Sequence, residues 1–110
     1  MNRTMLIGRL TRDPEVRYSD SGSAIARYTL AVNRNYRTGN GNGQAADFIS
    51  CVCFGQVASF VEKHLHKGIK LAVTGRIQTG SYVNMNGVKV YTTDVVVENH
   101  EFCESKSPTD

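Results

Sequence analysis

Apolar and polar residues alternate along much of this chain with a period of two, which is typical of half-buried β-strands. The pattern is clearest over residues 24–34, where the even positions from Ala24 to Val32 are apolar or aromatic and the odd positions include Arg27 and Asn33. Because successive side chains of a strand point to opposite faces, the even positions should face a core. The same reasoning predicts strands or extended segments at residues 4–10, 15–19, 47–54 and 70–78.

The period changes over residues 56–67, where apolar side chains recur at intervals of three and four. With this spacing Val57, Phe60 and Leu65 fall on one face of a helix. Gly68 follows and is the predicted C-cap, because glycine readily takes the left-handed conformation that ends many helices. The chain therefore contains one predicted helix, placed between two strands.

Two segments have the composition of hairpin turns. Residues 82–85 and 88–97 are predicted to pair around Asn86-Gly87, because this dipeptide adopts the backbone twist that tight hairpins need. Residues 38–44 (TGNGNGQ) are predicted to form a flexible hairpin tip. A phosphate-binding glycine loop would instead precede a helix and would usually contain a lysine, so that interpretation is rejected.

This order of elements predicts an all-β fold. One helix between the third and fourth main strands suits a five-stranded OB-fold Greek-key barrel with extended hairpins, an architecture whose face and loops bind oligonucleotides or oligosaccharides. Periodicity alone also allows another small barrel or an open sheet. The 110 residues form one domain. We place that domain at residues 1–103 and expect residues 104–110 to be a short, polar, frayed tail.

The net charge of +3 conceals an asymmetry along the chain. Residues 1–97 contain 12 Lys and Arg against 6 Asp and Glu, whereas residues 98–110 contain one Lys against 4 acidic residues. The body of the domain is therefore more basic than the average, and a basic body favours a polyanionic partner.

The cysteines argue against a disulfide framework or a metal site. There are three of them, and Cys51 and Cys53 share one face of a strand, where free cysteine behaves as a small buried hydrophobe. A zinc site would need a second pair of ligands, but His64 and His66 are two apart on a predicted helix and do not face each other. Without a signal peptide or an apolar run of roughly 20 residues, the expected location is the cytoplasm, away from membranes.

The sequence offers no pattern of catalytic residues. A nuclease would need carboxylates clustered around metal ions, but Asp13, Asp47, Glu62 and Asp94 lie on different predicted elements. His100 is expected at the surface of the tail. We therefore predict a protein that is not an enzyme and holds no cofactor.

Two phenylalanines form the first part of a candidate binding surface. Phe48 and Phe54 share one parity of the strand at residues 47–54, while Cys51 and Cys53 take the other. If the cysteine face is the core, the two rings stand on the outer surface, where exposed large apolar side chains usually mark a binding site. The reverse parity would place them in the core.

Tyrosines interleaved with arginines extend this candidate surface. Tyr36 lies between Arg34 and Arg37, and Tyr82 begins the last hairpin a few residues after Arg76. Bases of any sequence can stack on such rings, each stack contributing roughly 1–3 kcal/mol, while cations neutralise the phosphates. The pattern favours binding of single-stranded nucleic acid, with ordinary strand tyrosines as the alternative.

Over residues 1–103 the chain resembles the bacterial single-stranded DNA-binding protein (SSB) family. The resemblance implies an OB-fold, a homotetramer and single-stranded DNA wrapped around the assembly. It rests on an ordered set of segments: NRTMLIGRLTRDPEVRY at 2–18, YTLAVNR at 28–34, ADFISC at 46–51, KG at 67–68, GRIQTGSY at 75–82 and YTTDVVV at 91–97.

The resemblance also implies roles for individual residues. The family's four base-stacking positions fall on Tyr36, Phe48, Phe54 and Tyr82. We expect phosphate contacts from Arg3, Arg34, Arg37, Lys67 and Arg76. Tryptophan often occupies three of the stacking positions in relatives, and this chain has none, so we expect weaker contact per base. Relatives also often carry an arginine where Gly80 stands, which implies one phosphate partner fewer.

The end of the chain departs from the family pattern. Members usually carry a long glycine-rich tail with an acidic tip that recruits other proteins, but this sequence stops at Asp110. It is either a short natural form, such as a phage, plasmid or competence-type relative, or a shortened version of a longer chain. We assign no recruitment through an acidic tip to these residues. The predicted function is protection of single-stranded DNA in replication, recombination, repair or DNA uptake, in the nucleoid. A protein-docking module is the alternative.

Overall fold

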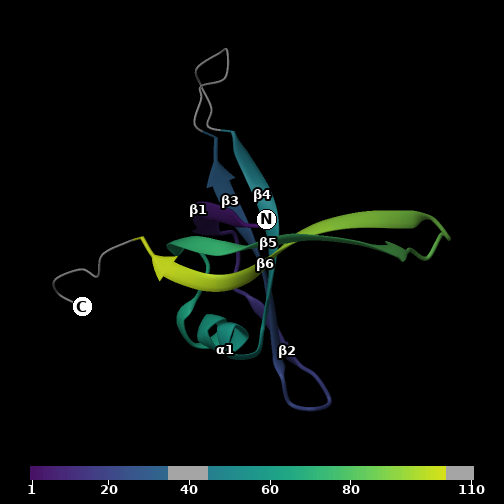
Figure 1. The fold of residues 1–110 in the computed structure, drawn as a ribbon, viewed down its shortest axis with the longest axis horizontal. Helices are drawn as coiled ribbons and strands as arrows, with labels where there is room; N and C mark the ends of the chain where they lie inside the picture. Colours follow the sequence, from purple (N-terminus) through teal and green to yellow (C-terminus); the bar gives the residue numbers. More distant parts are fainter. Residues whose placement is uncertain (35–44, 104–110) are drawn as a thin grey trace.

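The computed structural model describes residues 1–34 and 45–103, which form six β-strands and one α-helix (Figure 1). The predicted hairpin tip at 38–44 and the predicted tail at 104–110 lie outside the described residues. Among the described residues, no helix has the length and apolar character needed to cross a bilayer. In chain order the elements are β1 (Thr4–Leu10), β2 (Glu15–Tyr18), β3 (Ala24–Asn33), β4 (Ala46–Phe54), α1 (Gly55–His64), β5 (Lys70–Val83) and β6 (Lys89–Phe102).

The strands form one sheet in the order β1-β5-β6-β4-β3-β2, and β1, β5, β6, β4 and β3 close into a ring. Closure comes from β1, which pairs with β3 at Arg9–Ala31 and Leu10–Leu30 as well as with β5. The two backbones approach so closely that a Cβ on Gly8 would lie 2.3 Å from the carbonyl oxygen of Ala31. With β2 as a short additional strand, α1 follows the third of five main strands, and the predicted fold class is confirmed.

The barrel interior is filled by small and branched apolar side chains. Cys51 and Cys53 are 0 % exposed, which confirms that their face of β4 is the core. Ala58 and Val61 are also fully buried, so α1 covers the core with its apolar face, as the helical period predicted. Burying one branched apolar side chain contributes roughly 1.5–3 kcal/mol. The largest fully buried aliphatic residues are Leu30, Leu71, Val61 and Val73.

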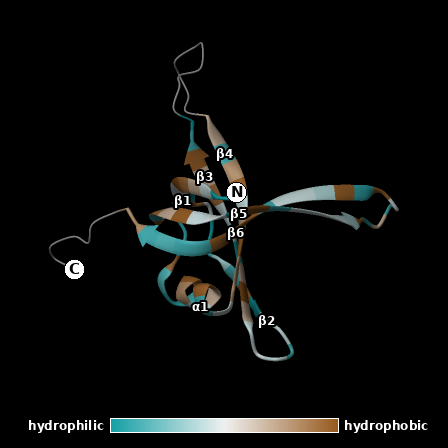
Figure 2. Ribbon diagram, in the orientation of Figure 1, coloured by the Kyte–Doolittle hydropathy of each residue, from teal (hydrophilic) through white to brown (hydrophobic). Residues whose placement is uncertain are grey.

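Long hairpins project from the barrel (Figure 1). The β5–β6 hairpin closes as predicted: Gly87 has a φ of +79°, and the Asn84 side chain accepts hydrogen bonds from the turn. The strands leading to it differ from the prediction. No break separates residues 78 and 82, because Gly80 pairs with Thr92 in an unbroken ladder. Most of this hairpin has intermediate or polar hydropathy, with an apolar band near its end (Figure 2).

The predicted end of the helix is wrong. The helix ends at His64, and Leu65 is its C-cap with an extended backbone. The physical reason is packing, because the extended conformation brings the Leu65 side chain into the core, where it is 6 % exposed. Gly68 does have a positive φ of +88°, but it serves the turn into β5, where its N–H donates to the carbonyl of Leu10.

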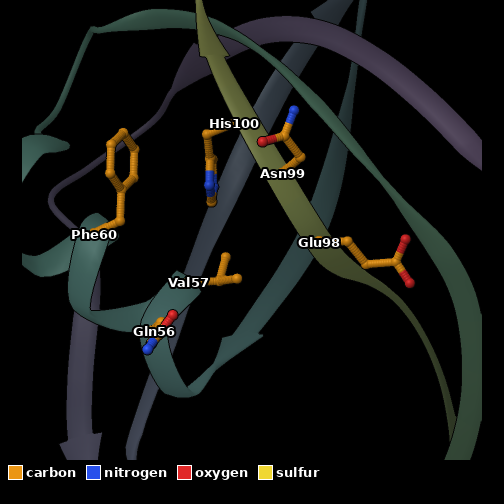
Figure 3. A pocket seen from close by; sticks show the side chains of 6 residues that line it. All are labelled: Gln56, Val57, Phe60, Glu98, Asn99 and His100. Atoms are coloured by element: carbon orange, nitrogen blue, oxygen red, sulfur yellow. The ribbon is translucent and has the colours of Figure 1, made fainter.

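The expectation that His100 lies at the surface of the tail is also wrong. The residue belongs to β6, and its Nε2 lies 2.7 Å from the hydroxyl oxygen of Tyr28. Its ring stacks on Phe60 of α1 with 5.6 Å between centroids, beside a hollow between the helix and β6 (Figure 3). Because burial disfavours the charged imidazolium, the pKa of His100 falls to about 4.

We expect acid to destabilise the fold through His100. The folded-state pKa of about 4 lies below the unfolded value of about 6.5. The contribution of neutral, buried His100 to the free energy of unfolding is therefore complete above pH 6.5 and is lost as the pH falls towards 4. Its upper limit is about 3 kcal/mol, reduced by solvent at the exposed part of the ring. Urea unfolding at pH 7, 5.5 and 4 should show a steeper loss for the wild type than for His100→Gln; parallel profiles would contradict this assignment.

Candidate nucleic-acid interface

The outer face of β4 exposes two phenylalanine rings. Phe48 is 67 % exposed and Phe54 is 49 % exposed, while the alternate residues Cys51 and Cys53 are sealed inside. The prediction that both rings stand outside the barrel is therefore confirmed. Water-exposed aromatic rings contribute little to folding, so their presence on a rigid strand indicates a surface for a partner.

The neighbouring strand β3 completes this surface. Phe48 lies opposite Ala31 and Phe54 lies opposite Ile25 in the antiparallel register. The two phenylalanines are six positions apart, which places their Cα atoms about 20 Å apart along the strand. Between them, Ser50 lies opposite Thr29 and Val52 opposite Arg27, so that hydroxyl and guanidinium groups lie between the two rings.

Strand pairing connects Tyr82 to the same face. Arg76 lies opposite Val96 of β6, and Val96 in turn lies beside Val52 of β4 in the parallel pair. Because paired residues point to the same side of a sheet, Arg76 shares the face that carries Phe54. Tyr82 lies six residues further along β5, on the same parity, and is 56 % exposed.

Arg34 is engaged in an ion pair at one end of this surface. One of its terminal nitrogens lies 2.8 Å from a carboxylate oxygen of Asp47, and its Nε lies 3.2 Å from the same oxygen. These hydrogen bonds lower the pKa of the Asp47 carboxyl, with a smaller contribution from the charge of Arg34. An incoming phosphate would therefore compete with Asp47 for this guanidinium.

The other predicted cations occupy different places. Arg3 is exposed beside Asn2, whose side chain bonds both the N–H and the carbonyl of Ile77 and so holds the start of the chain along β5, near Arg76. Lys67 lies in the turn beyond α1, where its backbone N–H donates to the carboxylate of Asp13 over 2.8 Å. Tyr36 and Arg37 lie outside the described residues.

Sequence reasoning missed three arginines next to this surface. The alternation along β3 could have predicted that Arg27 lies on this surface, because it occupies an odd, outward position opposite Val52. Arg12 and Arg17 line the same region with it, in hollows between β2, β3 and the preceding loop. No sequence pattern connects them, because their proximity depends on the pairing of β2 with β3.

A comparison with known protein families finds one family model that matches nearly the whole chain. The model of the "Single-strand binding protein family" matches residues 1–103. The chain belongs to the single-strand binding protein family.

Individual members of this family are similar along the whole chain. A single-stranded DNA-binding protein of Lactiplantibacillus plantarum is 49 % identical over 110 residues, which are 100 % of this chain and 54 % of that protein. One of Clostridium perfringens is 50 % identical over 106 residues, 96 % of this chain and 67 % of its own length. The chain thus spans about half to two thirds of these two curated relatives.

A solved structure has the same fold. It is described as a Plasmodium falciparum SSB complex with ssDNA, and it superposes with a TM-score of 0.83 at 25 % sequence identity. The match covers 94 % of this chain and 96 % of the other. The overall fold is therefore shared with a structure described as an SSB in complex with ssDNA.

The thiols offer no competing chemistry at this site. Burial raises the pKa of Cys51 and of Cys53 to about 12, so neither is a thiolate near neutral pH. Among the described residues, no three His, Cys, Asp or Glu side chains gather to hold a metal ion. Cys103, by contrast, is exposed at the end of β6.

We expect only Cys103 to react with a thiol reagent in the native protein. At pH 8 one thiol per chain should be labelled rapidly, and all three should react after denaturation, because the barrel shields Cys51 and Cys53. The Cys103→Ser variant is the control and should show no rapid labelling. Fast native labelling of that variant would mean that the core of β4 is open.

Proposed function

We propose that this chain binds single-stranded DNA without sequence preference and protects it. The observation that carries the proposal is the line of exposed rings on one barrel face: Phe48 and Phe54 on β4, with Tyr82 and Arg76 on the continuing sheet. The relatives named for single-stranded DNA binding, and the structure described as an SSB in complex with ssDNA, support it.

Stacking accounts for binding that is indifferent to sequence. Every base has a π-face, so Phe48, Phe54 and Tyr82, together with Tyr36 outside the described residues, can hold any of the four bases. In duplex DNA the bases are stacked on one another, so their faces are not accessible to these rings. The basic partners for phosphates in this proposal are Arg3, Arg34, Arg37, Lys67 and Arg76, and their contribution falls as salt rises.

The biological setting belongs to the same proposal. Holding strands apart and shielding them serves replication, recombination, repair or DNA uptake, in the cytoplasm and at the nucleoid. Residues 1–103 are the binding domain in this account, and no catalytic step is part of the function.

We further propose that the chain acts as a homotetramer. The outer face of β1 exposes Met5 (75 %) and Ile7 (55 %), with Ala72 of β5 opposite Ile7. An apolar face on a strand is a liability in a monomer and a natural contact between copies. Met5 and Ile7 lie on β1, whereas the phenylalanine rings lie on β4.

Light scattering tests the assembly. The wild type should have the mass of four chains, and Met5→Glu/Ile7→Glu should have a lower mass, because burying carboxylates in an apolar contact is costly. Met85→Glu, at the exposed hairpin turn, is the matched control and should keep the wild-type mass. A monomeric wild type would contradict the proposal.

Single replacements of the rings test DNA binding. Phe48→Ala, Phe54→Ala and Tyr82→Ala should each weaken oligo-dT binding by roughly 1–3 kcal/mol, or about five- to 150-fold, because one stacked base is lost. Tyr91→Ala is the control, since Tyr91 is 75 % exposed on the opposite face of the same hairpin. Fluorescence anisotropy with a labelled oligonucleotide gives the constants.

Two results would overturn the proposal. One is equal affinity for oligo-dT and for a duplex of the same length. The other is unchanged dT binding in the combined variant of all four proposed rings; if its biological effect also persisted, protein docking would be the main role.

A further inference from the structure

Arginines that the proposed phosphate contacts do not use lie on the outer side of β2 and β3. Arg27 of β3 is exposed and lies opposite Val52, two residues before Phe54 on β4. Its row is therefore about 7 Å along the strand from the row of the Phe54 ring. Arg27 is thus placed on the ring-bearing face, within reach of the backbone of anything stacked on Phe54.

Arg27 completes a row that runs across four strands. From β5 to β3 the row reads Arg76, Val96, Val52 and Arg27, all on the same face by register. The two valines between the arginines are buried, at 6 % and 3 % exposed. The row therefore has an arginine at each end of a buried apolar pair, and long cationic side chains can lie along such apolar residues while their charged ends stay in water.

The surface is hollowed beyond Arg27. One hollow, between β2 and β3, is lined by Arg27, Arg17, Glu15 and Ile25. Because Ile25 is the cross-strand partner of Phe54, this hollow begins where the proposed ring platform ends.

A second hollow adjoins the first through shared residues. Arg27 and Glu15 line it too, together with Arg12 and the hydroxyl-bearing Thr29 and Ser50. Thr29 and Ser50 pair with each other between the rows of Phe48 and Phe54, nearer to Phe48. Arg27 therefore stands where both hollows meet the stretch between the rings.

Two of these guanidinium groups are available. Within the described part of the chain, Arg12 and Arg27 form no hydrogen bond or ion pair. Arg17 pairs with Glu15 at 3.5 Å, but both side chains are largely exposed, and such pairs contribute little. Asp13, the other acid of the second hollow, accepts the Lys67 backbone N–H.

We propose that single-stranded DNA continues from Phe54 across β3 into these hollows, where Arg27 and Arg12 bind its phosphates. The inference rests on the proposed function and extends the path of the strand. Glu15 opposes the contact, since it places a carboxylate between the arginines and repels phosphate. Continuity with the Phe54 platform favours DNA here over an acidic segment of a protein.

Salt dependence of oligo-dT binding measures this contact directly. For single strands, each phosphate contact contributes about 0.7 to the slope of log affinity against log salt. The magnitude of this negative slope should therefore decrease by about 0.7 in Arg27→Gln and by about 1.4 in Arg12→Gln/Arg27→Gln. Lys63→Gln is the matched control, because it removes the same charge from exposed α1, away from the hollows.

A variant that is expected to strengthen binding controls for damage to the fold. Glu15→Gln removes the competing carboxylate and should tighten binding at low salt, which a damaged fold cannot do. Circular dichroism should show the wild-type spectrum for every variant compared.

The outcomes separate this inference from the proposed function. If the arginine variants keep the wild-type slope while Phe54→Ala weakens binding, the path across β3 is wrong and the function stands. The same conclusion follows if Lys63→Gln lowers the slope as much as Arg27→Gln. If the wild type does not bind oligo-dT, the proposed function itself fails.

Discussion

Everything in this structure depends on one constraint: alternate side chains of β4 must point to opposite faces of a closed barrel. The inward set, including Cys51 and Cys53, is completely buried and packs against α1 and the neighbouring strands. Phe48 and Phe54 belong to the outward set and are therefore exposed to solvent. A shift of one residue in register would reverse both sets, so the apolar core itself holds the rings outside.

The barrel also makes the ring positions rigid. Strand β4 is hydrogen-bonded to β3 along nine residue pairs and to β6 on its other side. Rings mounted on such a strand lose little freedom when a base stacks on them, which favours binding without a folding step. This arrangement leaves apolar surface exposed on the free protein, at the place where the proposed partner would cover it.

Much of the fold was predictable because local pattern and tertiary structure agree. The alternation in residues 24–34, the helical spacing after Phe54 and the Asn86-Gly87 turn all appear where expected. The helix end was misplaced because Leu65 leaves the helix to fill the core, a demand of packing that propensity does not record. The parity of Phe48 and Phe54 likewise followed from their strand alone.

The rest depends on residues far apart in the chain. His100 was expected at the surface of the tail, yet β6 continues and brings it to Tyr28, 72 positions away. Arg34 was expected to be available for phosphate, but pairing of β3 with β4 places Asp47 against it. The hollow at Arg27 arises in the same way, from the pairing of β2 with β3.

Photo-crosslinking tests the central claim most directly. An oligo-dT substituted with 5-bromouracil, bound and irradiated, would be mapped to peptides by mass spectrometry. The account predicts attachment at Phe48, Phe54 and Tyr82, on one face of the sheet. Attachment confined to Tyr91, on the opposite face of the hairpin, or to Met5 of β1 would contradict it.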